Sequence, residues 1–130
     1  EKRLVFLDRH AVQTAEYAFG GLHLYDYSTG GDGLTTLALS AYRTGGTCTL
    51  VTLSPSGKVI GERTVDTVTS IAAHGKQILV RSGAVLTLYN QQLEDMRTLE
   101  IDPLGVRDAR LLQSGRVLLI YDYSCAVQEI

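Results

Sequence analysis

The chain has 130 residues, a formal net charge of −2, and 45% hydrophobic against 20% charged residues. That composition is typical of a globular domain and excludes a disordered or membrane-spanning chain. It also argues against nucleic-acid binding, because the Lys and Arg residues are scattered singly or interleaved with acids. Thirteen glycines against two prolines, with many Thr, Val, Leu and Tyr residues, favour an all-β fold with tight turns.

In the first half of the chain, short apolar runs bounded by turn residues predict strands. Residues 11–17 fit a helical turn or a twisted strand, and the sequence leaves this choice open. The segment Ser28–Gly33 predicts a mobile surface loop, because its Gly and Asp residues tolerate positive φ. Ser54–Gly57 (SPSG) predicts a hairpin turn. The strands expected here are residues 3–8, 22–27, 34–42, 47–53 and 58–65.

The stretch Val68–Ile101 divides into four strand-like pieces, VTSIAAHG, KQILVRSG, AVLTLYNQQ and EDMRTLEI, with a turn signal at each junction. Leu93–Leu99 is the one segment here that also fits two helical turns. Asp102-Pro103-Leu104-Gly105 then breaks the chain. Further strands are expected at residues 106–112, 116–123 and 125–130.

These pieces repeat. Gly75 and Gly115 precede the matching segments KQILV and RVLLI, and turns at Gly46, Gly83 and Ser124 recur at a similar interval. A period of roughly 40 residues with four strands per unit is typical of propeller blades. Within a unit the first strand is small, the middle strands are apolar on both faces, and the last strand is charged, as an exposed edge requires.

The prediction is therefore one all-β domain, residues 1–130, built from about three antiparallel four-stranded propeller-type blades. The approximate units are 11–66, 67–102 and 103–130, with residues 1–10 forming an additional strand. A β-sandwich or barrel of about ten strands is the alternative.

Three blades do not close a propeller, which needs roughly four to eight. The chain is therefore expected to be a fragment of a longer propeller or to complete one by oligomerising through its open blade faces. Arg3–Asp8 is a candidate for the strand that the last unit lacks. No apolar run reaches the ~20 residues of a transmembrane helix. Because the chain starts at Glu1 without Met, any membrane anchor is expected to lie outside it.

The segments GKQILVRSGAVLTLYNQQLE and SGRVLLIYDYS resemble repeats of bacterial WD-like and PQQ-like propeller proteins. More narrowly, they are similar to an uncharacterised Firmicutes family with an N-terminal membrane helix and an outward-facing propeller. The resemblance covers Leu22–Ile130 through loose motifs, such as Leu24-Tyr25-Asp26 and Leu88-Tyr89-Asn90. It implies an extracytoplasmic location and a propeller architecture, but no chemistry. The chain has no Trp, unlike WD-repeat proteins proper.

Candidate ligand-binding residues are few. His74, at the end of a first strand, and the charged run Arg107, Asp108 and Arg110 could line the mouth of a channel. The competing interpretations are a turn histidine that bonds to backbone and a mutually compensating Arg–Asp set. Tyr25, Tyr27, Tyr121 and Tyr123 are expected to pack between units rather than to stack sugars.

No catalytic set, metal site or cofactor signature is apparent. Cys48 and Cys125 belong to no CxxC motif and are expected to be free, packed thiols. The predicted function is a non-catalytic interaction or scaffold module that binds a protein partner or itself. The alternative is part of an extracytoplasmic propeller enzyme, a hydrolase or lyase acting on glycans.

Overall fold

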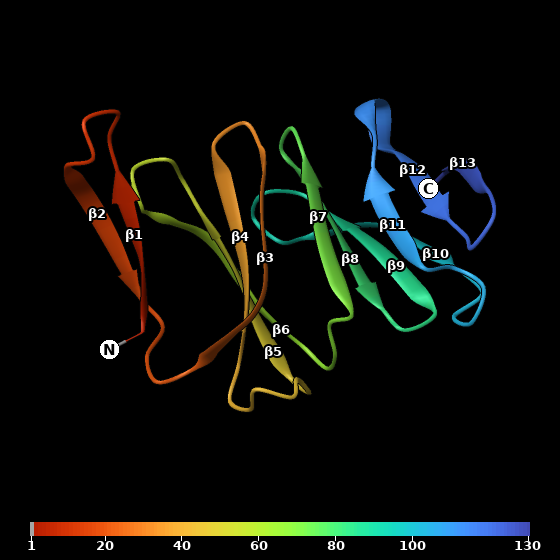
Figure 1. The fold of residues 1–130 in the computed structure, drawn as a ribbon, viewed down its shortest axis with the longest axis horizontal. Helices are drawn as coiled ribbons and strands as arrows, with labels where there is room; N and C mark the ends of the chain where they lie inside the picture. Colours follow the sequence, from red (N-terminus) through yellow and green to blue (C-terminus); the bar gives the residue numbers. More distant parts are fainter. Residues whose placement is uncertain (1) are drawn as a thin grey trace.

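The computed structural model describes residues 2–130, which form an all-β fold of four antiparallel sheets (Figure 1). We name them hairpin A and sheets B, C and D. Hairpin A contains β1 Arg3–Leu7 and β2 Gln13–Ala18. Sheet B contains β3 His23–Gly31, β4 Leu34–Ser40, β5 Cys48–Leu53 and β6 Val59–Val65. Sheet C contains β7 Ser70–His74, β8 Gln77–Ser82, β9 Val85–Tyr89 and β10 Asp95–Glu100. Sheet D contains β11 Asp108–Leu111, β12 Arg116–Ile120 and β13 Cys125–Glu129, with a 3₁₀ turn at Gln113–Gly115.

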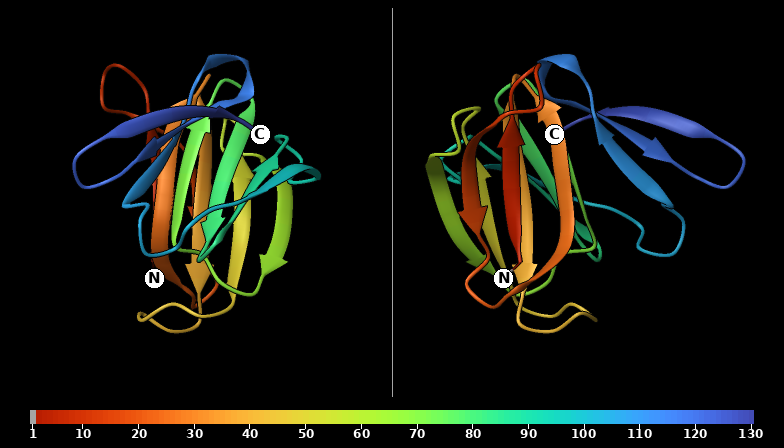
Figure 2. Two further views of the ribbon diagram at one scale, coloured as in Figure 1. Left: turned by 90° about the vertical axis from the view of Figure 1, so that its right-hand side faces the viewer. Right: turned by 60° about the vertical axis from the view of Figure 1, so that its left-hand side comes forward.

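Within each sheet the strands lie in chain order, so every neighbouring pair is joined by a hairpin. The sheets stack face to face along the molecule, as Figure 2 also shows. The first strands β3, β7 and β11 lie side by side in succession and point the same way. The strands neither close into a barrel nor reduce to the two sheets of a sandwich. Within residues 2–130 no helix is long and apolar enough to cross a membrane.

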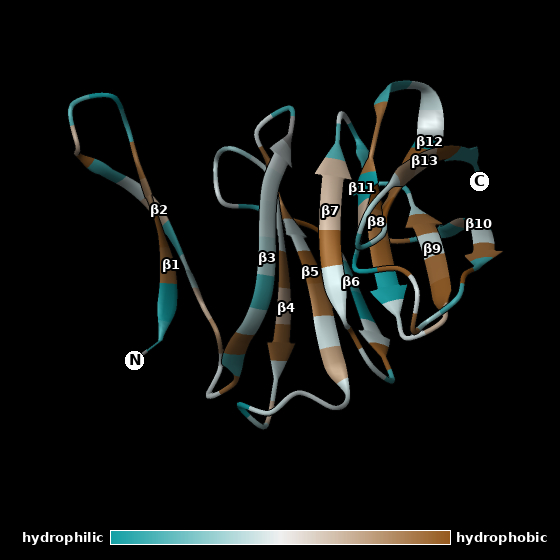
Figure 3. Ribbon diagram, turned by 45° about the vertical axis from the view of Figure 1, so that its right-hand side comes forward, coloured by the Kyte–Doolittle hydropathy of each residue, from teal (hydrophilic) through white to brown (hydrophobic). Residues whose placement is uncertain are grey.

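The core consists of three apolar clusters, one in each gap between neighbouring layers. Side chains alternate between the two faces of a strand. On β4, Leu37 and Leu39 therefore pack toward hairpin A, whereas Ala38 packs toward sheet C. On β8, Ile78 and Val80 pack toward sheet B. Figure 3 shows the resulting apolar character of the central strands. Sheets B and C thus bury both faces.

Two predictions about the N-terminal region need correction. Residues 11–17 resolve to strand β2, which pairs with β1 and not with sheet B. The β1 strand does not complete sheet D, because hairpin A packs on sheet B at the opposite end of the stack (Figure 1). The physical reason is that Leu4, Phe6 and Tyr17 contribute the apolar cover for the face of sheet B that points away from sheet C.

The predicted loop Ser28–Gly33 is also wrong for most of its length, because β3 continues to Gly31. Only Asp32 and Gly33, both with positive φ, form the turn into β4. Gly30 is required by packing: a Cβ at this position would lie 2.7 Å from the carbonyl oxygen of Ala73 on β7. The glycine therefore permits close approach of two strands rather than loop mobility. Residues 93–99, for which a helix was the alternative, contribute to strand β10.

Candidate interaction surface

The predicted ligand-binding residues divide into two groups. β7 and β11 lie side by side and run in the same direction (Figure 1). His74 is the last residue of β7, whereas Asp108 is the first residue of β11. The exposed His74 therefore lies at one end of the first strands and Arg107 and Asp108 at the other. The structure does not bring His74 together with the charged run.

Arg107 forms a bidentate ion pair with Asp122, a residue that the sequence analysis did not single out. Its Nε lies 2.5 Å from Asp122 Oδ1, and its Nη2 lies 3.0 Å from Oδ2. The hydrogen bond, with the opposite charge, raises the pKa of Arg107 and lowers that of the Asp122 carboxyl. Asp122 lies in the four-residue connection between β12 and β13. The strand register that places it beside Arg107 could not be read from the sequence.

Asp108 and Arg110 form a second ion pair, with Arg110 Nε 2.9 Å from Asp108 Oδ2. The other carboxylate oxygen, Oδ1, accepts the backbone amide of Ala109 at 2.9 Å. Asp108 and Arg110 thus compensate each other within the charged run, whereas Arg107 is compensated by Asp122 outside it. The Asp108 carboxylate therefore has both oxygens engaged, one by Arg110 and one by the Ala109 amide.

This second pair lies on the outer face of sheet D, the side that points away from sheet C. Ala109, Val117 and Leu119 pack toward sheet C. Alternation therefore directs their neighbours to the other side. Residues that are paired across neighbouring strands lie on the same face, so the register of β11, β12 and β13 identifies the remaining residues of the outer face. The outer face of sheet D consists of Asp108, Arg110, Arg116, Leu118, Ile120, Cys125, Val127 and Glu129.

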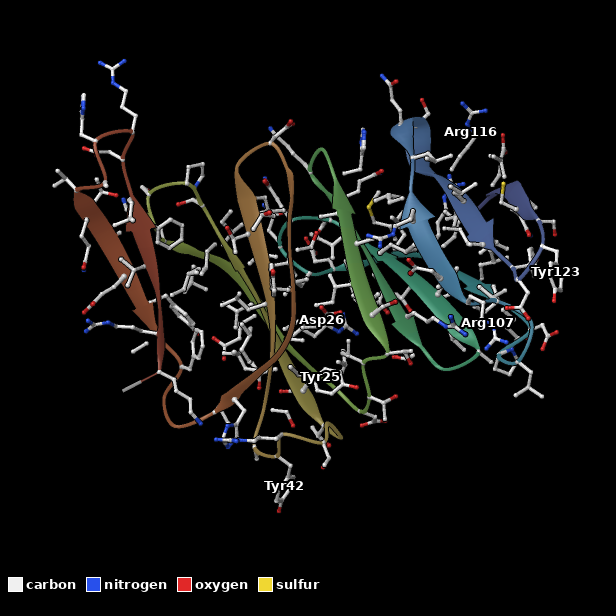
Figure 4. The ribbon with its side chains drawn as sticks, viewed as in Figure 1. Tyr25, Asp26, Tyr42, Arg107, Arg116 and Tyr123 are labelled. Carbon is white, nitrogen blue, oxygen red and sulfur yellow. The ribbon has the colours of Figure 1, made fainter. Side chains whose placement is uncertain are left out.

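Sheet B has a corresponding face, which is covered by sheet C, and its contacts show how a neighbouring sheet binds there. Asp26 on β3 lies between β3 and β7 (Figure 4). Its Oδ1 accepts the amide of Tyr27 at 2.8 Å, and its Oδ2 accepts the amide of Ile71 on β7 at 3.0 Å. Asp108 has the same local geometry, because its Oδ1 also accepts the amide of the next residue. Its Oδ2 is held by Arg110 in place of an amide from another sheet.

Sheets C and D are joined by Arg81, which is only 6% exposed. Its guanidinium donates to the carbonyl oxygens of Gly83 at 3.0 Å, Val106 at 3.0 Å and Pro103 at 3.3 Å. Three carbonyl acceptors satisfy a buried charge that is otherwise costly. Arg81 was not among the predicted site residues, because the run KQILVRSG indicates a middle strand that is apolar on both faces.

Of the four tyrosines predicted to pack between units, only Tyr121 does so. Tyr121 is partly buried against the cluster between sheets C and D. Tyr27 is 59% exposed and Tyr123 fully exposed. Figure 4 shows Tyr42 and Tyr123 projecting away from the sheets. Tyr27 lies on a first strand and Tyr123 in a turn, and no neighbouring layer covers either side chain.

Both cysteines are free, as predicted, but only Cys48 is packed. Burial raises the pKa of the Cys48 thiol. Cys125 is exposed on the outer face of sheet D, which corrects the expectation of two packed thiols. Within residues 2–130, no three His, Cys, Asp or Glu side chains gather closely enough to hold a metal ion.

The sequence matches no protein-family model and no curated protein significantly. Its fold is similar to a solved protein of unknown function from Bacteroides caccae, with 13% identity and a TM-score of 0.57 over 95% of this chain. It is also similar to Kluyveromyces marxianus Hsv2, with 12% identity and a TM-score of 0.57 over 82% of this chain. The match covers 48% of the first protein and 33% of the second. This chain therefore spans less than half of either.

Proposed function

We propose that sheets B, C and D are consecutive blades of a β-propeller and that the chain is a non-catalytic interaction module. The observation that carries the proposal is the burial of both faces of sheets B and C, combined with adjacent, co-directional first strands. Sheets that are apolar on both faces require a neighbour on each side. In-order strands with their first members together are the arrangement of radially packed blades.

The interaction surface in this proposal is the outer face of sheet D, which has no neighbouring layer within residues 2–130. Leu118 and Ile120 are partly buried there, and Val127 is 55% exposed. Exposed apolar residues within a charged rim mark surfaces that bind protein. The partner in this proposal is another sheet of the same kind, from a longer propeller or from a second copy.

The greater length of the two similar structures supports the proposal that further units complete the ring. An extracytoplasmic location, implied by the family resemblance, stays a prediction. The alternative function, glycan hydrolysis or elimination by a propeller enzyme, has no specific observation in its favour. The first-strand carboxylates are engaged, Asp108 by Arg110 and the Ala109 amide, and Asp26 by the amides of Tyr27 and Ile71.

Light scattering after size-exclusion chromatography tests the proposal on the purified chain. We expect a mass above that of the 14.1 kDa monomer, rising with concentration, or binding of an apolar dye. Leu118→Asp on the outer face of sheet D should lower both signals. The control, Val59→Asp, changes an exposed apolar residue on β6, away from this face. A strictly monomeric chain without dye binding would contradict the proposal.

A further inference from the structure

Three basic side chains gather at the end of sheet B where β3 begins and β4 ends. Lys2 Nζ lies 2.5 Å from His23 Nδ1. Arg43, in the connection between β4 and β5, is close enough for its charge to act on the same imidazole. Partial burial, followed by the positive charges of Lys2 and Arg43, lowers the pKa of His23. The fold thus holds two cations and a titratable ring together.

The backbone fixes Lys2 and His23 beside each other. The amide of Phe19 donates to the carbonyl of Lys2 at 3.0 Å, and the carbonyl of Phe19 accepts the amide of Leu22 at 3.2 Å. The Phe19 side chain is only 7% exposed and belongs to the cluster between hairpin A and sheet B. His23 follows Leu22 directly. One buried residue therefore anchors the backbone of both basic groups.

The loop that carries Arg43 is also held in place. Ser40 Oγ donates to the carbonyl of Gly45 at 3.2 Å and accepts the amide of Tyr42 at 3.3 Å. A Cβ at Gly45 would lie 2.8 Å from Cε1 of Tyr25, so the loop rests against this ring. Figure 4 shows Tyr25 and Tyr42 at the same end of sheet B. Arg43 thus extends from a loop whose position is set before any ligand binds.

No acid of the described chain balances these charges. None of the ion pairs among residues 2–130 involves Lys2 or Arg43. Two acids on the adjoining strands β2 and β3 are engaged elsewhere. Glu16 pairs with Arg3 at 3.3 Å, and both oxygens of Asp26 accept backbone amides. The positive charge at this end of sheet B is therefore available to an anion.

The hydrogen-bonding capacity of the three groups defines the class of that anion. Because an ammonium group only donates, the Lys2 contact makes His23 Nδ1 an acceptor and places the imidazole proton on Nε2. Lys2 keeps two further N–H donors, and Arg43 contributes a planar fork. Donors of this kind bind oxygen atoms, and the fork matches the oxygens of a tetrahedral group such as phosphate.

We propose that Lys2, His23 and Arg43 form a binding site for a tetrahedral dianion, either sulfate or a phosphate group. The inference goes beyond the proposed interaction function and does not rest on it, because the site lies at the shared end of hairpin A and sheet B. Protonated His23 supplies a third positive charge, while Lys2 turns from Nδ1 to the ligand. Anion binding is therefore coupled to the protonation of His23.

Sulfate tests the proposal in an NMR titration of the full chain, with chloride used to keep the ionic strength constant. We expect saturable shifts of the His23 ring signals, with a midpoint on the order of 1–10 mM near pH 5.5. Near pH 8 the binding should be about two- to fivefold weaker, because His23 is neutral while sulfate stays a dianion. Sulfate should raise the pKa of His23. The ring signals of His10 and His74 should not respond to sulfate. An absence of saturation, or equal responses of all three histidines, overturns the proposal.

Variants separate the site from a general effect of charge. Arg43→Gln should weaken sulfate binding about fivefold, the size expected for loss of one exposed ion pair. Arg9→Gln is the matched control, because it removes an exposed arginine from the turn between β1 and β2, at the opposite end of hairpin A (Figure 1). It should bind as the unaltered chain does. Equal binding by the two variants overturns the proposal.

His23→Gln should retain weak binding and lose its dependence on pH, and an unchanged pH dependence overturns the role of His23. The outer-face variant Leu118→Asp should leave sulfate binding unchanged, which separates this test from that of the proposed function.

Phenyl phosphate and inorganic phosphate distinguish a monoester from a free ion as the source of the dianion. Tyr42, which is 71% exposed, adjoins Arg43 and offers a ring to the organic part of a monoester. Tighter binding of phenyl phosphate that is lost in Tyr42→Ala identifies a monoester site. Equal binding of the two compounds identifies a site for the free ion. Either result supports the proposed site, whereas binding of neither compound overturns it.

Discussion

The carboxylate of Asp26 on β3 accepts the backbone amide of Ile71 on β7 at 3.0 Å, and so links the first strands of two neighbouring sheets. Hairpins join all neighbouring strands within sheets B and C, whereas this bond joins the two sheets through residues 45 positions apart. The Ile71 side chain is buried in the cluster between these sheets. The bond therefore fixes the position of β7 along the direction of β3. Apolar packing alone specifies this relative position only weakly.

Asp26→Ala should lower the free energy of unfolding by about 1–3 kcal/mol, because it leaves the amide of Ile71 without its charged acceptor. Urea denaturation followed by circular dichroism measures the change. Asp66→Ala, at an exposed position in the connection between sheets B and C, is the control and should change stability little. Equal stability of both variants would show that the bond contributes nothing measurable.

Arg81 links sheet C to the segment that enters sheet D, and we expect it to be the most sensitive charged residue of the chain. Arg81→Lys keeps the charge but cannot reach three carbonyls with a planar fork. It should destabilise the chain by about 1–3 kcal/mol. Hydrogen exchange should then show faster loss of protection in sheet D than in sheet B.

Arg116→Lys is the matched control for this prediction, since Arg116 is exposed on the outer face of sheet D. It should leave both the unfolding free energy and the exchange pattern unchanged. Uniform loss of protection across sheets B, C and D in Arg81→Lys would contradict a local role for Arg81.

The all-β class and most strand positions follow from the sequence, because turn residues and apolar runs are local signals. Ile78–Val80 has apolar side chains on both faces of a short run, and this pattern correctly indicated a strand covered on two sides. Strand partners are not local. Nothing in the sequence of Gln13–Ala18 distinguishes a hairpin with β1 from the start of sheet B, because the register depends on which face finds apolar cover.

Gly30 and Arg81 show why the remaining features could not be predicted. Gly30 lies in a Gly- and Asp-rich segment, so its composition indicates a loop, whereas its role depends on the carbonyl of Ala73 43 positions away. Arg81 ends an apolar run where a charge usually reaches solvent. Its burial depends on three carbonyls that converge only after sheet D has packed. Contacts between sheets, rather than within them, were the information that the sequence lacked.

The Arg107–Asp122 pair predicts that the stability of the chain depends on pH in the acidic range. The folded-state pKa of Asp122 is lowered, mainly by its hydrogen bond from Arg107. The bond's contribution to stability is therefore complete above the ordinary pKa of about 3.9 and is lost as pH falls through the lower folded-state pKa. An NMR titration of the Asp122 carboxyl should give a midpoint below that ordinary value.

The variant Arg107→Gln removes the charge and one half of the fork, so the midpoint of Asp122 should move up toward the ordinary value. Arg110→Gln is the control, because Arg110 pairs with Asp108 and not with Asp122. A midpoint that is the same in all three proteins would show that the ion pair does not persist in solution.

The two cysteines should differ sharply in reactivity. Cys125 is exposed on β13, whereas Cys48 is 1% exposed in the core between sheets B and C, and its pKa is raised by burial. Since the thiolate is the reactive form, Ellman's reagent should modify one thiol rapidly in the native chain and the second only on unfolding. Cys125→Ser should abolish the rapid phase and Cys48→Ser should retain it. Because Cys125 lies on the outer face of sheet D, association through that face should also slow the rapid phase as protein concentration rises. Two thiols reacting at the same rate would contradict the packing of Cys48.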